Sequence, residues 1–163
     1  MAEKVAIIPG LVIKQNAQFN MIDFYHSLKA WFELNRYNLV ETQYEEKTVN
    51  AKKNLSIKWT GTKEIDDYTQ FEVGVGISLG NYEIISTEKE KLASGALKIK
   101  FSSKMVTDYE DKWSNKPFMK FMRDVADKYF STEKSEVYKK ELKNDTYDIY
   151  NKAKSFLNLQ KFR

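Results

Sequence analysis

The chain has 163 residues, and its formal net charge at pH 7 is +4. It contains no cysteine and one histidine, which excludes a disulfide scaffold, a thiolate zinc site and a cysteine nucleophile. Hydrophobic residues make up 42% of the chain and charged residues 31%, a balance typical of a folded globular protein.

The chain is predicted to form one domain over residues 1–163, because no linker of biased composition and no internal repeat divides it. An apolar run from Val5 to Ile13 is interrupted by Pro9 and Gly10 and is too short to span a bilayer. The run also lacks the flanking signals of a secretory signal peptide. We therefore predict a cytoplasmic protein without a transmembrane segment.

A strand followed by a helix is predicted at the start of the chain. The strand covers residues 4–14 and bends at Pro9–Gly10. Asn16 or Asn20 can cap the helix, which should end near residues 36–38. One apolar stripe marks the buried side of this helix: Met21, Phe24, Tyr25, Leu28, Trp31 and Phe32.

Between residues 40 and 102, apolar and polar residues alternate, which predicts an antiparallel sheet with one buried and one exposed face. In the first strand of this region, Val40, Thr42 and Tyr44 are expected to share a face. Gly80–Asn81 is expected to form a tight turn before a separate strand at residues 82–85. Together with the first strand of the chain, this gives about six strands.

Helical spacing returns in the last third of the chain. Pro117 fits the first turn of one helix, which Ser114 or Asn115 can cap. Its buried side is expected to contain Phe118, Phe121, Met122, Val125 and Tyr129. Ser131 or Thr132 can cap another helix that continues toward the C-terminus. The predicted fold class is therefore α+β: a curved antiparallel sheet of about six strands, with a helix after the first strand and C-terminal helices packed on one face.

This order of elements resembles the helix-grip superfamily, the START and birch-pollen-allergen class. The resemblance covers the element order and no family-specific motif. It implies a curved sheet that wraps a long terminal helix around a cavity. A different α+β sandwich, with the helices packed on one face of the sheet, is the alternative.

The buried face of the sheet is the first candidate site. A pocket between the sheet and the C-terminal helices would be lined by Trp59, Phe71, Val73, Val75, Ile99 and Phe101. A solid core would bury the same side chains, so the sequence leaves both interpretations open. The leading hypothesis is a non-enzymatic binding module that holds an apolar small molecule or a lipid.

The alternative hypothesis is a basic interaction protein. Lysine and arginine without any acidic residue characterise the C-terminal segment 151–163, which contains Lys152, Lys154, Lys161 and Arg163. Such a segment suits nucleic acid, a ribonucleoprotein or a protein partner, although the same cations also suit the end of a helix. Lys58, Lys98 and Lys100 are expected on the exposed face of the sheet, as a second basic surface or as part of a mixed solvated one.

Motifs for catalysis or for a cofactor are not found in the sequence. The glycines Gly74 and Gly76 alternate within a strand, which indicates sheet curvature rather than a phosphate-binding loop. His26 and Asp23, the pair Asp66–Asp67 and the acidic residues at 108–111 lack the further ligands that a metal site needs. We therefore expect no enzyme, no cofactor and no metal, while the ligand and the oligomeric state stay open.

Overall fold

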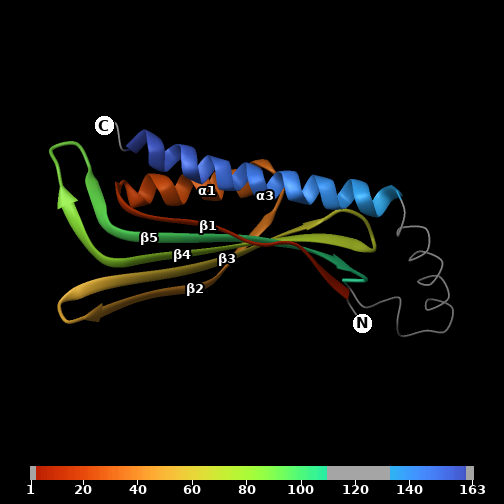
Figure 1. Cartoon of the computed structure of the whole chain (residues 1–163), viewed down its shortest axis with the longest axis horizontal. Coiled ribbons are helices and arrows are strands. Elements are labelled where there is room, and N and C mark those ends of the chain that lie inside the picture. The colour runs from red at the N-terminus through yellow and green to blue at the C-terminus, as the bar shows by residue number, and fades with distance from the viewer. Residues whose placement is uncertain (1–2, 110–132, 161–163) are drawn as a thin grey trace.

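The structure is a computed structural model that describes residues 3–109 and 133–160. Within these residues, five strands form one sheet and two helices cover one of its faces (Figure 1). The elements are β1 (Glu3–Phe19), α1 (Met21–Leu34), β2 (Asn38–Val49), β3 (Lys52–Glu64), β4 (Thr69–Ser86), β5 (Lys91–Thr107) and α3 (Glu133–Gln160). The predicted α+β class is confirmed.

All neighbouring strands run antiparallel, in the order β1-β5-β4-β3-β2. Strands β2 to β5 form a meander, whereas β1 pairs with β5, so β1 and β2 are the two edges of the sheet. The chain therefore crosses the sheet through α1, from the β1 edge to the β2 edge. We call the face that α1 and α3 cover the inner face, and the opposite face the outer face.

Asn20 caps the N-terminus of α1. The side-chain oxygen of Asn20 accepts a hydrogen bond from the backbone nitrogen of Asp23 at 3.1 Å, which satisfies one of the free donors of the first turn. The helix buries the predicted stripe through Phe24, Leu28, Trp31 and Phe32. It ends before Arg36, whose positive φ of 64° is incompatible with a continuing right-handed helix.

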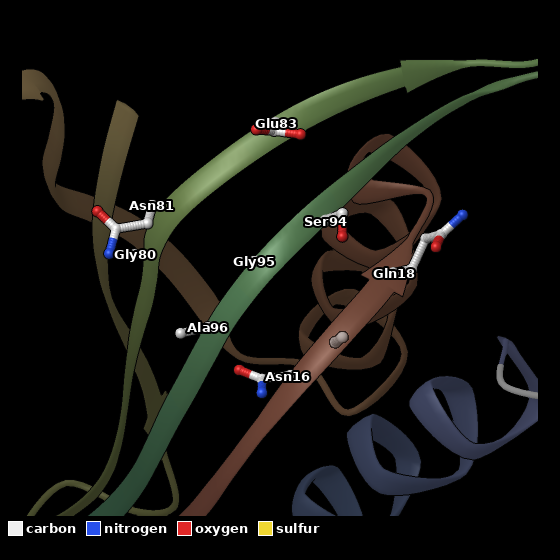
Figure 2. Close-up of a pocket in the computed structure, with 9 residues that line it drawn as sticks. Asn16, Gln18, Gly80, Asn81, Glu83, Ser94, Gly95 and Ala96 are labelled. Carbon is white, nitrogen blue, oxygen red and sulfur yellow. The ribbon is translucent and has the colours of Figure 1, made fainter. Parts of the chain in front are cut away.

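The predicted turn at Gly80–Asn81 is wrong, and the strand count with it. Gly80 pairs with Ala96 and Glu83 pairs with Ser94, so the residues between them form a bulge within one continuous strand. Asn81 adopts a φ of 48°, as it would in a turn, but the pairing of β4 with β5 resumes beyond it. Figure 2 shows both strands bending next to Gly80 and Asn81. Residues 71–79 and 82–85 thus belong to β4, and the described sheet has five strands rather than six.

The hairpin between β2 and β3 turns through Asn50 and Ala51, whose φ values of 53° and 64° are those of a type I′ turn. Alanine is sterically strained at a positive φ, whereas glycine is not. We expect Ala51→Gly to raise the free energy of unfolding in urea by about 0.5–1 kcal/mol. Ala30→Gly, inside α1, is the control and should lower it by about 1 kcal/mol. Equal destabilisation by both changes would contradict the left-handed turn.

The long helix α3 is fixed on the inner face by side-chain hydrogen bonds to α1, to the loops and to the sheet. These bonds join Trp31 Nε1 to Asp148 Oδ2 (2.7 Å), Tyr37 Oη to Asp145 Oδ2 (2.8 Å), Tyr138 Oη to Asp66 Oδ2 (3.0 Å) and Thr146 Oγ1 to Ser103 Oγ (2.8 Å). The position of α3 is therefore specified by polar contacts as well as by its apolar side. The other predicted C-terminal helix, with Pro117 in its first turn, lies outside the described residues.

Candidate functional site

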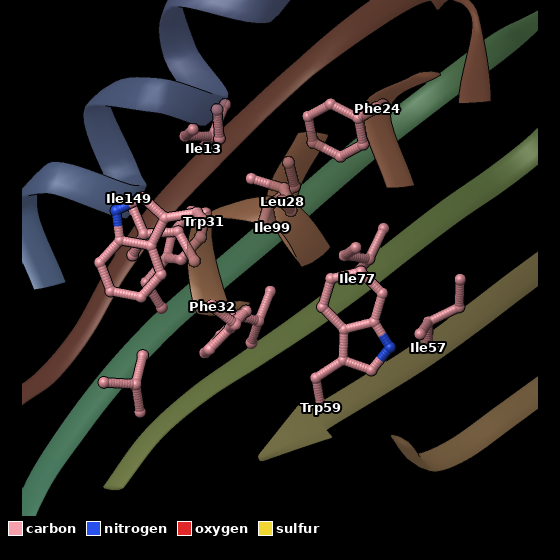
Figure 3. Packing of buried hydrophobic residues seen from close by; sticks show 14 of the residues in the cluster. Ile13, Phe24, Leu28, Trp31, Phe32, Ile57, Trp59, Ile77, Ile99 and Ile149 are labelled. Atoms are coloured by element: carbon pink, nitrogen blue, oxygen red, sulfur yellow. The ribbon is translucent and has the colours of Figure 1, made fainter. Parts of the chain in front are cut away.

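The six side chains predicted to line a pocket are all buried in one hydrophobic cluster with residues of α1 and α3. Figure 3 shows two of the six, Trp59 and Ile99, within this cluster. Their aromatic members touch helical rings: Trp59 with Tyr25 at 4.9 Å and Phe32 at 6.3 Å between centroids, Phe71 with Tyr138 at 6.2 Å, and Phe101 with Tyr150 at 5.9 Å. Val73, Val75 and Ile99 belong to the same cluster. Helical side chains therefore occupy the space beside these rings, which favours the solid core at these positions.

The structure describes only part of the predicted basic C-terminal segment. Lys152 is half-buried on α3, and Lys154 is exposed, with its Nζ 5.4 Å from the ring centroid of Tyr150. Lys161 and Arg163 lie outside the described residues. The contact between this segment and a partner stays a prediction.

An open groove lies at the border of the core, between the first two turns of α1 and the strands β2 and β3. Its volume is about 460 Å³, which falls in the range of small-molecule sites. The groove is lined by Met21, Ile22, Tyr25, His26, Glu41, Tyr44, Leu55 and Ile57. Two of its large side chains are strongly exposed, Ile22 at 67% and Tyr44 at 61%. The groove therefore offers apolar surface that the fold itself does not cover.

A bulge in β2 puts the polar residues of the groove on the helix side of the sheet. Glu41 pairs with Trp59 and Tyr44 pairs with Ile57, with the register shift between Glu41 and Gln43. Directly paired residues share a face, so Glu41 and Tyr44 both lie on the inner face. The prediction that Val40, Thr42 and Tyr44 share one face is wrong, because the extra residue at the bulge reverses the alternation.

Two tyrosines donate hydrogen bonds to carboxylates on this side of the sheet. Tyr25 Oη donates to Glu41 Oε2 at 2.8 Å, and Tyr82 Oη donates to Glu46, which pairs with Leu55. Burial, reinforced by the bond to Glu41, raises the pKa of Tyr25 above its ordinary value. Burial and the bond to Glu46 raise the pKa of Tyr82 to about 12. Both phenols therefore stay protonated at neutral pH, and each carboxylate keeps a second oxygen that can accept a hydrogen bond from a ligand.

The indole of Trp59 packs edge-on against the ring of Tyr25, one of the groove-lining residues. The Trp59 side chain is 2% exposed, and its Nε1 has no hydrogen-bond partner among the described residues. Figure 3 shows this nitrogen on the side of Ile57, one of the groove-lining residues. A buried N–H group without an acceptor is destabilising, so this nitrogen is a polar group that the described core leaves unsatisfied.

Asp66, one of the acidic candidates from the sequence, has a structural role. Asp66 Oδ1 accepts hydrogen bonds from the backbone nitrogens of Tyr68 and Thr69 at 2.9 and 2.7 Å, which closes the loop between β3 and β4. His26 is exposed, and its ring packs edge-on against Tyr25. No cluster of three or more potential metal ligands occurs in residues 3–109 and 133–160. Residues 110 and 111 lie outside these ranges.

Comparison of the chain with known protein families gives no match, and neither does comparison with curated proteins. None of the helices that the structure describes has both the length and the apolar character needed to span a bilayer.

Sequence reasoning missed most of the groove, because its residues come from elements that are distant in the chain. Ile22 lies one position outside the buried stripe of α1, and Tyr44 is an aromatic residue on an edge strand. Exposed apolar side chains just outside a stripe are a weak signal, since single ones are normal on protein surfaces. Only the packing of α1 against β2 and β3 brings them together.

Proposed function

We propose that the protein is a non-enzymatic binding module for a small molecule with an apolar body and a cationic head group. The binding site in this proposal is the groove between α1, β2 and β3. The observation that carries the proposal is the combination, in one groove, of uncovered apolar side chains with the carboxylate of Glu41. Ligand sites typically join a large apolar surface to a few oriented polar groups.

The negative charge of the groove favours a ligand with a cationic head group over one with a carboxylate. Glu41 lines the groove, Glu46 lies on the same face opposite Leu55, and His26 is the single basic side chain among the lining residues. An ammonium group can bond to the second oxygen of Glu41, and such charge-assisted bonds are about twice as strong as neutral ones. A carboxylate head group would instead face like charge. We therefore propose an amine, rather than a fatty acid, as the ligand class.

The proposed site differs from the one that the helix-grip resemblance implies, which is a cavity between the sheet and the terminal helix. Trp59, Phe71 and Phe101 contact aromatic rings of α1 and α3, which leaves the border of the core as the better-supported place. A helix-grip relationship remains part of the proposal. It is supported by the order of the elements, with α1 after β1 and a long helix at the C-terminal side of the sheet.

The test compares two probes of equal chain length, dodecylamine and dodecanoate, below their micelle concentrations. Binding is followed by titration calorimetry and by tryptophan fluorescence, since Trp59 contacts Tyr25 of the groove. We expect saturable binding of dodecylamine and weaker binding of dodecanoate. Equal or tighter binding of dodecanoate would refute the cationic head group, and failure of both probes to bind would refute the groove as a site for amphipathic molecules.

Ile22→Asn is expected to weaken the binding of dodecylamine about tenfold or more, because burying an isoleucine side chain contributes about 1.5–3 kcal/mol. Leu34→Asn is the matched control: Leu34 is on the same helix, is 78% exposed and does not line the groove. Because both side chains are exposed, both variants should fold. Equal affinities of the two variants would place the amine elsewhere on the protein.

A further inference from the structure

A cluster of lysines lies on the outer face of the sheet, away from the groove. Lys14 pairs directly with Lys98, and Gly76 lies between Lys58 and Lys100 in the register of β3, β4 and β5. This confirms the predicted common face of Lys58, Lys98 and Lys100. All four lysines are exposed, and none forms an ion pair with another residue of the described part of the chain.

The lysine cluster is unfavourable for the isolated protein. Like charges directly opposite each other on neighbouring strands destabilise a sheet, and Lys14 and Lys98 are such a pair. Neighbouring strands are about 5 Å apart and alternate residues along a strand about 7 Å apart, so the four charges share a small area. A bound polyanion would relieve this repulsion.

The surface between the lysines is open to a ligand. A Cβ atom at Gly76 would meet nothing within 4 Å, so this glycine has no packing role on the outer face. Its neighbours on this face include Ser78, which pairs with Lys98, and Ser102, which pairs with Gly74. Hydroxyl groups and an uncovered backbone let phosphate oxygens approach closely.

A polar hollow continues the same face where the sheet bends. Asn16 and Ala96 are two residues beyond Lys14 and Lys98 on β1 and β5, and they pair with each other. The hollow has a volume of about 520 Å³ and is lined by Asn16, Ala17, Gln18, Gly80, Asn81, Glu83, Ser94, Gly95 and Ala96. Figure 2 shows Asn16 on β1 and Asn81 on β4, on either side of β5. Amide side chains are therefore gathered next to the lysine cluster.

We propose that the outer face binds a single-stranded nucleic acid. Phosphate groups contact Lys14, Lys58, Lys98 and Lys100, and a base enters the hollow beside Asn16. Asparagine and glutamine amides both donate to and accept from base edges, and unstacked bases of single strands are free to enter such a hollow. The carboxylate of Glu83 repels phosphate and accepts hydrogen bonds from base amino groups, which orients the strand with its phosphates toward the lysines.

An anionic membrane surface fits this face less well. Adsorption to a membrane combines basic residues with apolar side chains that insert among the lipids. Next to the lysines the outer face presents Gly76, Ser78 and Ser102. Its exposed apolar residues there are two valines, Val12 opposite Lys100 and Val40 opposite Thr60, and neither is a large side chain suited to insertion. The hollow combines amide, hydroxyl and carboxylate side chains with small alanines and glycines and has no large apolar side chain among its lining residues. Both features suit a nucleotide.

The experiment is fluorescence anisotropy with a labelled single-stranded RNA of about 12 nucleotides, a length within the usual site sizes. Each neutralised phosphate contributes about 0.7 to the slope of log Kd against log salt concentration, so we expect a slope of about 3. Lys98→Gln/Lys100→Gln should halve that slope and weaken binding at low salt at least tenfold. Lys140→Gln/Lys143→Gln on α3 removes the same charge from the inner side and should leave the slope unchanged.

A further variant separates the hollow from the lysines. Ala96→Leu fills the hollow without altering charge, so binding should weaken about fivefold while the salt slope stays the same. Equal losses in the two lysine double variants would overturn the proposal, as would no RNA binding at low salt. Binding to anionic phospholipid vesicles without RNA binding would also overturn it and would favour a membrane surface.

Discussion

Phe32→Ala is expected to lower the free energy of unfolding by about 3–5 kcal/mol, the range for a large aromatic side chain removed from a core. Phe32 is fully buried, and its ring contacts those of Trp31, Tyr37 and Trp59 at centroid distances of 5.2, 6.0 and 6.3 Å. It therefore joins α1 to the sheet at the place where the chain enters β2. Urea denaturation followed by far-ultraviolet circular dichroism measures the loss.

The ring of Phe32 packs directly against Gly61 of β3, so the contact between the two residues can be tested with a pair of substitutions. A Cβ atom at Gly61 would lie 2.5 Å from Cε1 of Phe32, far inside contact distance. Gly61→Ala alone should therefore destabilise the protein by about 1–3 kcal/mol through overpacking. In the Phe32→Ala background the added methyl group finds space, so the double variant should be about as stable as Phe32→Ala or more stable.

Gly76→Ala is the control for this cycle, since a Cβ atom there meets no neighbour. It should be neutral or slightly stabilising in both backgrounds, because alanine is favoured over glycine within a strand. If the effects of Gly61→Ala and Phe32→Ala add without coupling, the close approach of α1 to β3 at Gly61 is refuted.

The wild-type protein is expected to lose stability steeply between pH 10 and pH 12. Burial, together with a hydrogen-bonded carboxylate, raises the pKa of Tyr25, Tyr37, Tyr82 and Tyr138 above the ordinary value of 10.0. Below pH 10 these phenols are protonated in the folded and the unfolded chain, and their contribution is complete. Above pH 10 the unfolded chain releases protons that the folded chain retains, so the free energy of unfolding falls as the pH rises.

Tyr37→Phe isolates one member of this set. Tyr37 is 5% exposed and donates to Asp145, so the variant should lose about 1.5–3 kcal/mol at pH 8, the value of a hydrogen bond to a charged group. From pH 10 upward, the gap between wild type and variant should shrink by about 1.4 kcal/mol per pH unit. Urea titrations over this range measure the gap. Tyr147→Phe, at an exposed position of α3, should follow the wild-type curve, and a constant gap for Tyr37→Phe would contradict the prediction.

Sequence patterns over a few neighbouring residues correctly predicted α1 and the buried faces of β3, β4 and β5. The cap at Asn20 and the apolar stripe of α1 were readable because both depend on neighbours within a few residues. The alternation in β3, β4 and β5 also predicted which side chains are buried and placed Lys58 and Lys100 on the opposite face. These are properties of single helices and strands, and the sequence pattern is sufficient for them.

Features that depend on strand pairing could not be predicted from the sequence pattern. The bulge at Asn81 looks like a turn until the pairing of Glu83 with Ser94 is known. The bulge between Glu41 and Gln43 moves every later side chain of β2 to the other face of the sheet. The alternation of apolar and polar residues in β2 does not indicate this bulge. The groove depends on that shift, because without it Tyr44 would point away from α1.

The pairing of β1 with β5 also constrains the order in which the protein can form. The register joins Glu3 to Thr107, so among the described strands β1 pairs with β5 alone, although β5 is the last of the five to be synthesised. At synthesis rates of about 5–20 residues per second, β1 waits on the order of ten seconds before β5 has been made. During that interval the β2–β3 and β3–β4 hairpins can close, whereas β1 exposes both of its edges to other nascent chains. Chaperone dependence during synthesis is therefore expected to concentrate on β1, which waits longest for its partner among the five described strands.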